Sequence, residues 1–323
     1  VVSLENVQLL NSGLFGLHVD DQAPEYQDDP NPAGTDSDAG ISLSLLNTLV
    51  LNNGIGMLDY DGVRIDDGGD GGIVAAIQST NIDANGGDGL ELDERGPGNV
   101  QMAVSNSTFN ANGFFDAADL DDGLDVDEAG DGSILASLTN VELVGNFDEG
   151  LDLDEEDEGG ANLTLRHVRA NLNLDEGIKV SEEDGGSVFA RLQDVAAHNN
   201  GDDGVELEEE GDGSVVVRLN NVTTISNGDA GIQIAESDAG SMLTTLSRVR
   251  SQQNAGNGAQ LAESGPGNLF ISAADSLFAQ NGKASLSYLL RKHRTGNFQG
   301  LLVYLPGLLT VYPPFGNRVF QWL

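Results

Sequence analysis

The sequence predicts an all-β fold, a parallel β-helix of about nine coils with 27 residues in each coil. Three observations predict it. A glycine-led block returns at a fixed interval, each block alternates apolar and polar residues, and one position of every unit is an asparagine. A repeat of this kind overrides the one to three domains that a length of 323 residues allows, because a solenoid grows in one dimension without splitting.

The repeat is marked by glycines that open a block of the form glycine-aliphatic-x-aliphatic. Each of these glycines is position one of its unit. They are Gly62, Gly89, Gly123, Gly150, Gly177, Gly204, Gly231 and Gly258, and an earlier copy begins at Gly16. The intervals from Gly62 onward are 27 residues, except for one of 34 residues. Six equal intervals indicate a repeat architecture, whereas one match would be weak.

Each unit contains the pattern of three short strands. Positions two and four are apolar with polar residues between them, as in Leu124 and Val126, which predicts a strand with one buried face. A second glycine at position ten, such as Gly132, indicates a bend or a close approach of the backbone. A second strand follows at 133–138, and a third begins near Val141. We expect each strand to pair with its counterparts ~4.8 Å above and below.

Position 24 supports the same fold independently. It is asparagine in all eight complete units: Asn85, Asn112, Asn146, Asn173, Asn200, Asn227, Asn254 and Asn281. An asparagine tolerates the left-handed conformation of a turn, and its amide can bond to the asparagine one coil away. We therefore predict an asparagine ladder along the solenoid.

The segments "LTNVELVGNFDEGLDL" and "LNNVTTISNGDAGIQI" resemble the repeat of right-handed parallel β-helix proteins, the pectin-lyase-like superfamily. The resemblance covers roughly residues 1–284 and implies a right-handed coil. It implies no single activity, because that superfamily includes polysaccharide lyases, hydrolases, epimerases, phage tailspikes and adhesins. The "GDDG" at 201–204 is similar to a polygalacturonase motif, but the downstream Gly-His-Gly and Arg-Ile-Lys segments of that family are missing.

The composition limits the partners. The chain has 53 acidic and 14 basic residues, and its net charge of −39 repels nucleic acid and anionic lipid. No run of 18 apolar residues is present, so we expect no membrane span. The chain has no cysteine, which excludes disulfides and thiolate-bound metals. Cations remain the natural partners of such a polyanion.

The acids recur at fixed positions of the unit. Position six is acidic in every unit, and position five and the turn before position one are acidic in many. Equal positions stack in a β-helix, so we expect ladders of carboxylates along one edge. Two charges ~4.8 Å apart repel by roughly 1 kcal/mol even in water, so these ladders need neutralising partners. Arg64 and Lys179 supply little of that charge, although Lys179 should stack between Asp152 and Glu206.

Carboxylates of adjacent coils can converge on a hard divalent cation such as Ca²⁺. We therefore predict a row of calcium sites, densest around residues 121–158 and 202–212. The candidate ligands are Asp93, Asp121, Asp122, Asp125, Asp127, Glu128, Asp148, Glu149, Asp152, Asp154, Glu155, Asp202, Asp203, Glu208 and Glu209. Two other interpretations remain open: a halophilic composition, with three lysines in all, and an undirected acidic surface.

Two further features indicate partners or caps. Position thirteen should point outward, yet in most units it is apolar: Val74, Leu135, Phe189, Val216, Leu243 and Phe270. This stripe predicts a covering segment or a partner, either a protein or a polysaccharide. Residues 285–323 form an atypical tail without acidic residues, rich in basic and aromatic residues. We interpret the tail as a cap, a docking arm or an extension of the β-helix domain at 1–284.

The leading functional hypothesis is a non-enzymatic, extracellular or cell-surface module for adhesion or matrix building, stabilised by calcium. The alternative is a calcium-dependent polysaccharide lyase or glycoside hydrolase. Insertions near 22–39 and 114–120 flank Arg64, Glu91 and Asp93, where an active site is conceivable. Each of these residues has charged counterparts in other coils, so we assign no catalytic residue. No signal peptide is visible in this chain.

Overall fold

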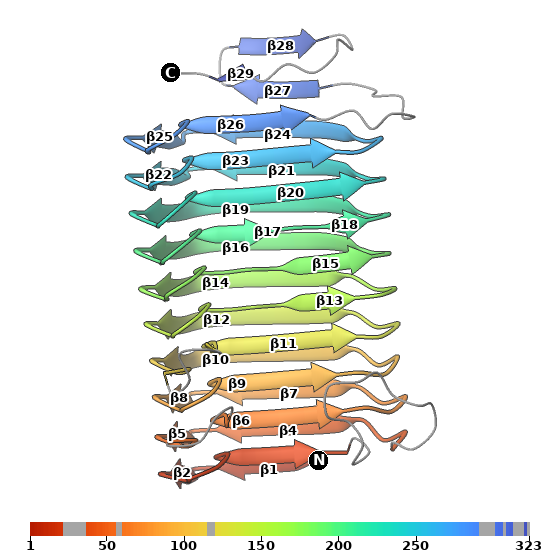
Figure 1. Ribbon diagram of the computed structural model, residues 1–323, viewed down its shortest axis with the longest axis vertical. Coiled ribbons are helices and arrows are strands. Elements are labelled where there is room, and N and C mark those ends of the chain that lie inside the picture. The colour runs from red at the N-terminus through yellow and green to blue at the C-terminus, as the bar shows by residue number, and fades with distance from the viewer. Residues whose placement is uncertain are drawn as a thin grey trace.

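The coils of the protein stack in one direction from the N-terminus to the C-terminus (Figure 1). The computed structural model describes residues 1–21, 37–55, 60–114 and 120–290, together with strands at 301–305, 308–312 and 320–321. The predicted repeat is confirmed by the strand register. Asp93 pairs with Asp127, and Asp127 pairs with Asp154, so the same position of each unit returns one coil later.

Two long sheets carry the coils, and the chain crosses between them in each turn of the solenoid. Sheet 1 contains β3 (Leu17–Asp20), β6 (Val63–Asp67), β9 (Leu90–Glu94), β11 (Leu124–Ala129), β13 (Asp154–Glu156), β15 (Ser181–Asp184), β17 (Val205–Leu207), β18 (Glu210–Gly211), β20 (Ile232–Asp238), β23 (Ala259–Ser264), β26 (Leu286–Leu290) and β29 (Phe320–Gln321). All pairings within it are parallel except that of β29 with β26.

Sheet 2 contains the second and third strands of each unit. Its members are β1 (Val2–Glu5), β2 (Gln8–Leu10), β4 (Ile41–Leu46), β5 (Leu49–Leu51), β7 (Ile73–Gln78), β8 (Asn81–Asp83), β10 (Val100–Asn110), β12 (Ile134–Val144), β14 (Ala161–Asn171), β16 (Ser187–His198), β19 (Ser214–Ile225), β21 (Ser241–Ser247), β22 (Arg250–Gln252), β24 (Asn268–Ala274), β25 (Leu277–Ala279), β27 (Leu301–Leu305) and β28 (Leu308–Tyr312).

In the central coils the two predicted strands of sheet 2 join into one strand of 11 or 12 residues. One left-handed residue lies at each join, for example Asn140 with a φ of 61° and Asp194 with a φ of 56°. Asparagine and aspartate tolerate this conformation better than most residues. The chain therefore turns a corner there while its ladder of hydrogen bonds continues.

The core is a continuous column of apolar side chains between the sheets. Positions two and four of the units point inward, as predicted, and Leu124, Val126 and Leu151 are fully buried. The glycine at position ten is required by close approach rather than by its dihedral angles. A Cβ on Gly159 would overlap the carbonyl oxygen of Gly132 one coil below and the Oε1 of Glu155. Glycine at this position lets successive coils stack at strand spacing.

The predicted asparagine ladder is confirmed. Asn173 donates from Nδ2 to the Oδ1 of Asn200 at 3.2 Å and to the carbonyl oxygen of Leu143 at 3.3 Å. Its own Oδ1 accepts from the backbone N and the Nδ2 of Asn146, both at 3.1 Å. One expectation is corrected: the left-handed residue of this turn is not the asparagine but its predecessor, such as Leu172 with a φ of 63°.

The strands of the C-terminal tail continue both sheets. β26 pairs in parallel with β23, and β27 pairs in parallel with β24. Two antiparallel strands follow, β28 on β27 and β29 on β26, at the end of the stack (Figure 1). The rest of the tail, and most of both predicted insertions, lie outside the described residues. No described segment is a helix that is long and apolar enough to cross a membrane.

We expect Asn173→Ala to destabilise the protein by about 2–4 kcal/mol, because it leaves buried amide groups of two neighbouring coils without partners. The measurement is the midpoint of urea unfolding. Asn162 is the matched control, since its side chain is exposed on β14, and Asn162→Ala should change stability by less than about 0.5 kcal/mol. Equal midpoints for the two variants would contradict a stabilising ladder.

Candidate cation-binding site

The outer side of sheet 1 and the turn before it carry most of the acids. We call this surface the acidic face and define it by three positions of the unit. The turn acids are Asp61, Asp88, Asp122, Glu149, Glu176 and Asp203, position three provides Glu91, Asp125, Asp152 and Glu206, and position five provides Asp66, Asp93, Asp127, Asp154 and Glu208. Strand alternation places positions three and five on one face, opposite the apolar positions.

The turn acids are held in place by the backbone of the next coil. The Oδ1 of Asp61 accepts from the backbone N of Asp88 at 2.8 Å, and the Oδ1 of Asp122 accepts from the backbone N of Glu149 at 2.6 Å. The Oδ1 of Asp203 accepts from the backbone N of Ala230 in the same way, at 2.5 Å. Each of these three aspartates therefore uses one oxygen to join two coils, which fixes its position along the solenoid.

Three carboxylate oxygens come within 4.8 Å of one another at several places on this face. One group is Asp122, Glu149 and Asp152, and all three residues are buried. Further groups include Asp61 with Asp88 and Glu91, Glu91 with Asp125 and Asp127, Asp148 with Glu149 and Asp175, and Asp175 with Glu176 and Asp202. Convergent carboxylates from successive coils are the ligand chemistry that calcium prefers.

Two arginines compensate carboxylates near the N-terminal end of the acidic face. Arg64 contacts Glu91 at 2.6 Å and Asp66 at 2.8 Å, and Arg95 contacts Asp93 at 2.5 Å. Arg64, Glu91 and Asp93, the residues between the two predicted insertions, are thus close together in the structure. Because the arginines pair with carboxylates of the same face, the arrangement acts first as charge compensation.

Lys179 provides the other compensating charge. Its Nζ lies 2.6 Å from Asp152 and 3.2 Å from Glu149. The predicted contact with Asp152 is confirmed. No ion pair joins Lys179 to Glu206 among the described residues, and Gln233 donates to Glu206 instead.

Between Arg95 and Lys179 lies a part of the acidic face where two aspartates contact no basic side chain of the described chain. Asp122 and Asp125 form no ion pair with any lysine or arginine of the described chain. Burial, followed by repulsion from Glu149 and Asp88, raises the pKa of Asp122 well above its ordinary range. Burial, followed by repulsion from Asp127 and Asp88, does the same for Asp125. This is the position where a bound cation would relieve the most repulsion.

The structure brings most of the predicted ligands to this face. Asp122, Asp125, Asp127, Asp148, Glu149, Asp152 and Asp202 take part in the convergent groups, Asp93 pairs with Arg95, and Asp154 stands beside Asp127 in the ladder. Asp203 lies in the line of turn acids, and Glu208 lies beside Glu206 and Gln233. Asp121 lies in the turn, where its backbone carbonyl oxygen accepts from the backbone N of Asp148 at 3.0 Å. Five further acids take part in the convergent groups but are not among the predicted ligands: Asp61, Asp88, Glu91, Asp175 and Glu176. Their signal was available, because Glu91 at position three shares the face of position five and the other four are acids of the turn before position one.

Glu128, Glu155 and Glu209 do not lie on the acidic face, which corrects the expectation of ladders along one edge. They occupy position six, which has the inward phase of positions two and four, and each is fully buried. Burial and repulsion from Glu182 raise the pKa of Glu155 to about 8. These three carboxyls therefore face the core, with the apolar residues of positions two and four.

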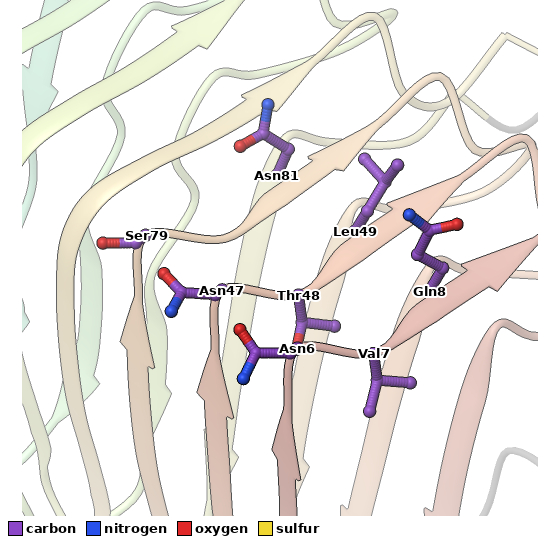
Figure 2. Close-up of a pocket in the computed structure, with 8 residues that line it drawn as sticks. All are labelled: Asn6, Val7, Gln8, Asn47, Thr48, Leu49, Ser79 and Asn81. Atoms are coloured by element: carbon purple, nitrogen blue, oxygen red, sulfur yellow. The ribbon is translucent and has the colours of Figure 1, made fainter.

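Two other surfaces are not acidic. Figure 2 shows a hollow at the N-terminal coils lined by Asn6, Asn47 and Ser79, with the two amides stacked one above the other. Its lining contains no charged side chain, so it provides no cation site. On sheet 2 the predicted apolar stripe at position thirteen is exposed, as at Phe189, which is 47% exposed.

Comparison of the chain with protein-family models, with curated proteins and with solved structures gives no match. Of the predicted resemblance, the structure confirms the parallel β-helix architecture alone. Function has to be argued from the residues of the site.

The first prediction from the site concerns charge compensation. Lys179→Gln leaves Glu149 and Asp152 without their nearest cation, so the calcium-free protein should lose about 1–2 kcal/mol, between the values for exposed and buried pairs. The rise in unfolding temperature on adding calcium should be larger than in the unchanged protein. Arg169→Gln is the control, because Arg169 pairs with Glu142 on an exposed part of sheet 2. A calcium response unaffected by Lys179→Gln would contradict the prediction.

The second prediction concerns pH. Burial is the first cause that raises the pKa of Asp93 to about 6, of Asp148 to about 7 and of Asp203 to about 8, from an ordinary value of 3.8. The folded protein then binds protons more tightly than the unfolded chain, so this stabilisation is complete below the ordinary value of 3.8 and is lost progressively as pH rises through the folded pKa values, from about 4 to about 8. In a chelator at constant ionic strength, the unfolding temperature should fall between about pH 5 and pH 8. A flat or rising profile would contradict it.

Proposed function

We propose that the protein is a non-enzymatic β-helical scaffold that calcium stabilises at the acidic face, acting outside the cell as an adhesion or matrix module. The convergence of Asp122, Glu149 and Asp152 carries this proposal, because their oxygens lie within 4.8 Å of one another on successive coils. The neighbouring Asp125 adds a carboxylate without a basic partner among the described residues. Lys179 supplies one positive charge to Glu149 and Asp152, and a divalent cation would supply the charge that the four acids still lack.

Calcium fits these ligands better than a smaller ion does. It accepts six to eight oxygen ligands in flexible geometry, whereas magnesium demands a near-ideal octahedron and keeps its waters. Carboxylates fixed to a stack of coils provide oxygens at spacings set by the backbone, which favours the more adaptable ion. Extracellular modules bind calcium weakly, at about 10⁻⁴–10⁻³ M, which suits a row of sites on a surface.

The scaffold role follows from where the ligands are attached. Each convergent group draws residues from at least two coils, so one ion joins coils that otherwise interact through strand pairing and the core. In a solenoid, stability is the sum of the coils and their interfaces, and an ion at an interface contributes directly to it. The exposed apolar stripe on sheet 2 is a separate surface that supports a partner-binding role.

The test is thermal unfolding of the full chain with calcium, magnesium or sodium at matched ionic strength. Calcium at 100 times its dissociation constant should add about 2.7 kcal/mol per site, while sodium only screens. Asp125→Asn should blunt the response to calcium. Asp131→Asn is the matched control, because Asp131 is exposed on the same coil and should leave the response intact.

Pure repulsion predicts a different pattern. Asp125→Asn would then stabilise the calcium-free protein, and no calcium-specific effect would exist to be lost. Equal stabilisation by sodium and calcium would reduce the acidic face to a salt-adapted surface. A screen of uronate and neutral polysaccharides with calcium present is the companion assay, and turnover of any of them would contradict the non-enzymatic role.

A further inference from the structure

The interior of the solenoid contains a second line of carboxylates. Position six of every unit is acidic and points into the core, where each of these residues is at most 1% exposed. We call its glutamates the glutamate column. They are Glu94, Glu128, Glu155, Glu182, Glu209, Glu236 and Glu263, and Asp67 precedes them at the N-terminal end. Buried charges of this kind need a partner, because leaving one uncompensated costs several kcal/mol.

Most oxygens of the column lack donors; the exceptions are the Oε1 of Glu94, which accepts from the backbone N of Gly96 at 3.0 Å, and the Oε1 of Glu263, which accepts from the backbone N of Gly265 at 3.1 Å. Both carboxylate oxygens of five members accept no hydrogen bond from the described residues; these are Glu128, Glu155, Glu182, Glu209 and Glu236. The carboxyls of Glu128 and Glu155, and those of Glu236 and Glu263, interact with one another across neighbouring coils. Two carboxylates can share such a contact only if a proton or a cation lies between them.

A backbone oxygen faces the same space in each coil. A Cβ on Gly159 would overlap both the Oε1 of Glu155 and the carbonyl oxygen of Gly132. The same pair of overlaps, with a glutamate Oε1 and a glycine carbonyl oxygen, occurs at Gly132, Gly186, Gly213 and Gly240. Carboxylate and carbonyl oxygens therefore gather beside the position-ten glycines. All of these atoms are acceptors, so the group has the ligand set of a calcium site.

A neutral ladder would not require acids. Position 24 shows the neutral solution, in which asparagine amides donate and accept from coil to coil. Position six has an acid in all eight units and an amide in none, although glutamine has the shape of glutamate. The difference between the two residues is the ability to balance a positive charge.

We propose that the glutamate column binds calcium ions between successive coils, inside the solenoid and separate from the acidic face. The ligands are the carboxylates of two neighbouring members and the carbonyl oxygen of the adjacent position-ten glycine. Near Glu236 and Glu263 the position-five residues are Ala235 and Ala262, so the column continues beyond the acids of the outer face. The interior sites therefore do not depend on the proposed function.

Enclosure gives these sites a distinct behaviour. The carboxyls of the column are shielded from solvent, since each member is at most 1% exposed. Calcium ions would therefore enter while the coils fold onto one another and leave only when the coils open. Calcium at the acidic face exchanges with solvent, whereas calcium in the column is retained. This difference allows the two classes of site to be measured separately.

The experiment refolds the full chain with calcium, removes exchangeable ions by desalting into chelator, and counts the retained calcium per chain by atomic emission. The unchanged protein should retain several ions. The Glu182→Gln variant should retain at least one calcium ion fewer, and so should Glu236→Gln, which lies nearer the C-terminal end of the column. Glu183→Gln is the matched control, because it makes the same change at the exposed neighbouring residue, and its retained calcium should not change.

Three outcomes would overturn the proposal. They are an unchanged protein that retains no calcium, a count that Glu182→Gln and Glu236→Gln leave unaltered, and an infrared band of protonated carboxyls that persists in calcium and shrinks in Glu182→Gln. The last outcome would mean that the column holds protons. Asp125→Asn separates this proposal from the proposed function, since it should reduce exchangeable calcium and leave the retained count intact.

Discussion

The stacking of identical positions is the constraint on which the rest of this structure depends. Each coil repeats the one below it at strand spacing, so every side chain faces its own counterpart. Apolar residues then form a continuous core, and amides form a ladder with both donors and acceptors used. Acids are the exception, because a carboxylate placed above a carboxylate has nothing to donate. The protein carries such columns both outside and inside the solenoid.

The two kinds of acidic column meet different physical conditions. On the acidic face, Arg64, Arg95 and Lys179 compensate neighbouring carboxylates, and solvent screens what remains. In the core solvent does not screen the carboxyls and no basic side chain contacts them among the described residues. From Glu128 to Glu236 they have only each other and glycine carbonyl oxygens as polar neighbours. A metal ion or proton from solution therefore stabilises the carboxylates of the acidic face, whereas the carboxyls of the glutamate column cannot be buried without one.

Much of the fold could be predicted because a repeat turns one observation into many. The glycine spacing, the inward phase of Leu124 and Val126 and the asparagine ladder follow from the sequence, since each is a local pattern that stacking multiplies. The left-handed residue before each asparagine could not be predicted, because residues as different as Leu172 and Ser226 occupy it. The backbone turn selects that conformation, and the side chain merely tolerates it.

The candidate site was predicted less completely, and the reasons are physical. Alternation already implied that Glu155 points inward with Leu151 and Leu153, but its charge suggested an exposed edge. Here register was the stronger constraint, because a strand cannot turn one residue outward without a bulge or a slip. The membership of Glu91 in the convergent groups followed from the same alternation. Which acids actually meet depends on side-chain positions across two coils, and one sequence does not contain that information.

The acidic face is also uneven along the solenoid. From Asp66 to Asp154 the position-five residues of successive units are all aspartates, while Ala235 and Ala262 occupy that position near the C-terminal end. In the same coils position three changes from acids to the amides Gln233 and Gln260, and the Nε2 of Gln260 donates to the Oε1 of Gln233 at 2.9 Å. Repulsion is thus concentrated in the first and central coils, and the later coils stack through neutral hydrogen bonds. In a solenoid whose coils interact only with their neighbours, this places the dependence on cations bound at the acidic face in the acidic coils. In the amide-paired coils only the buried carboxyls of Glu236 and Glu263 still need a partner from solution.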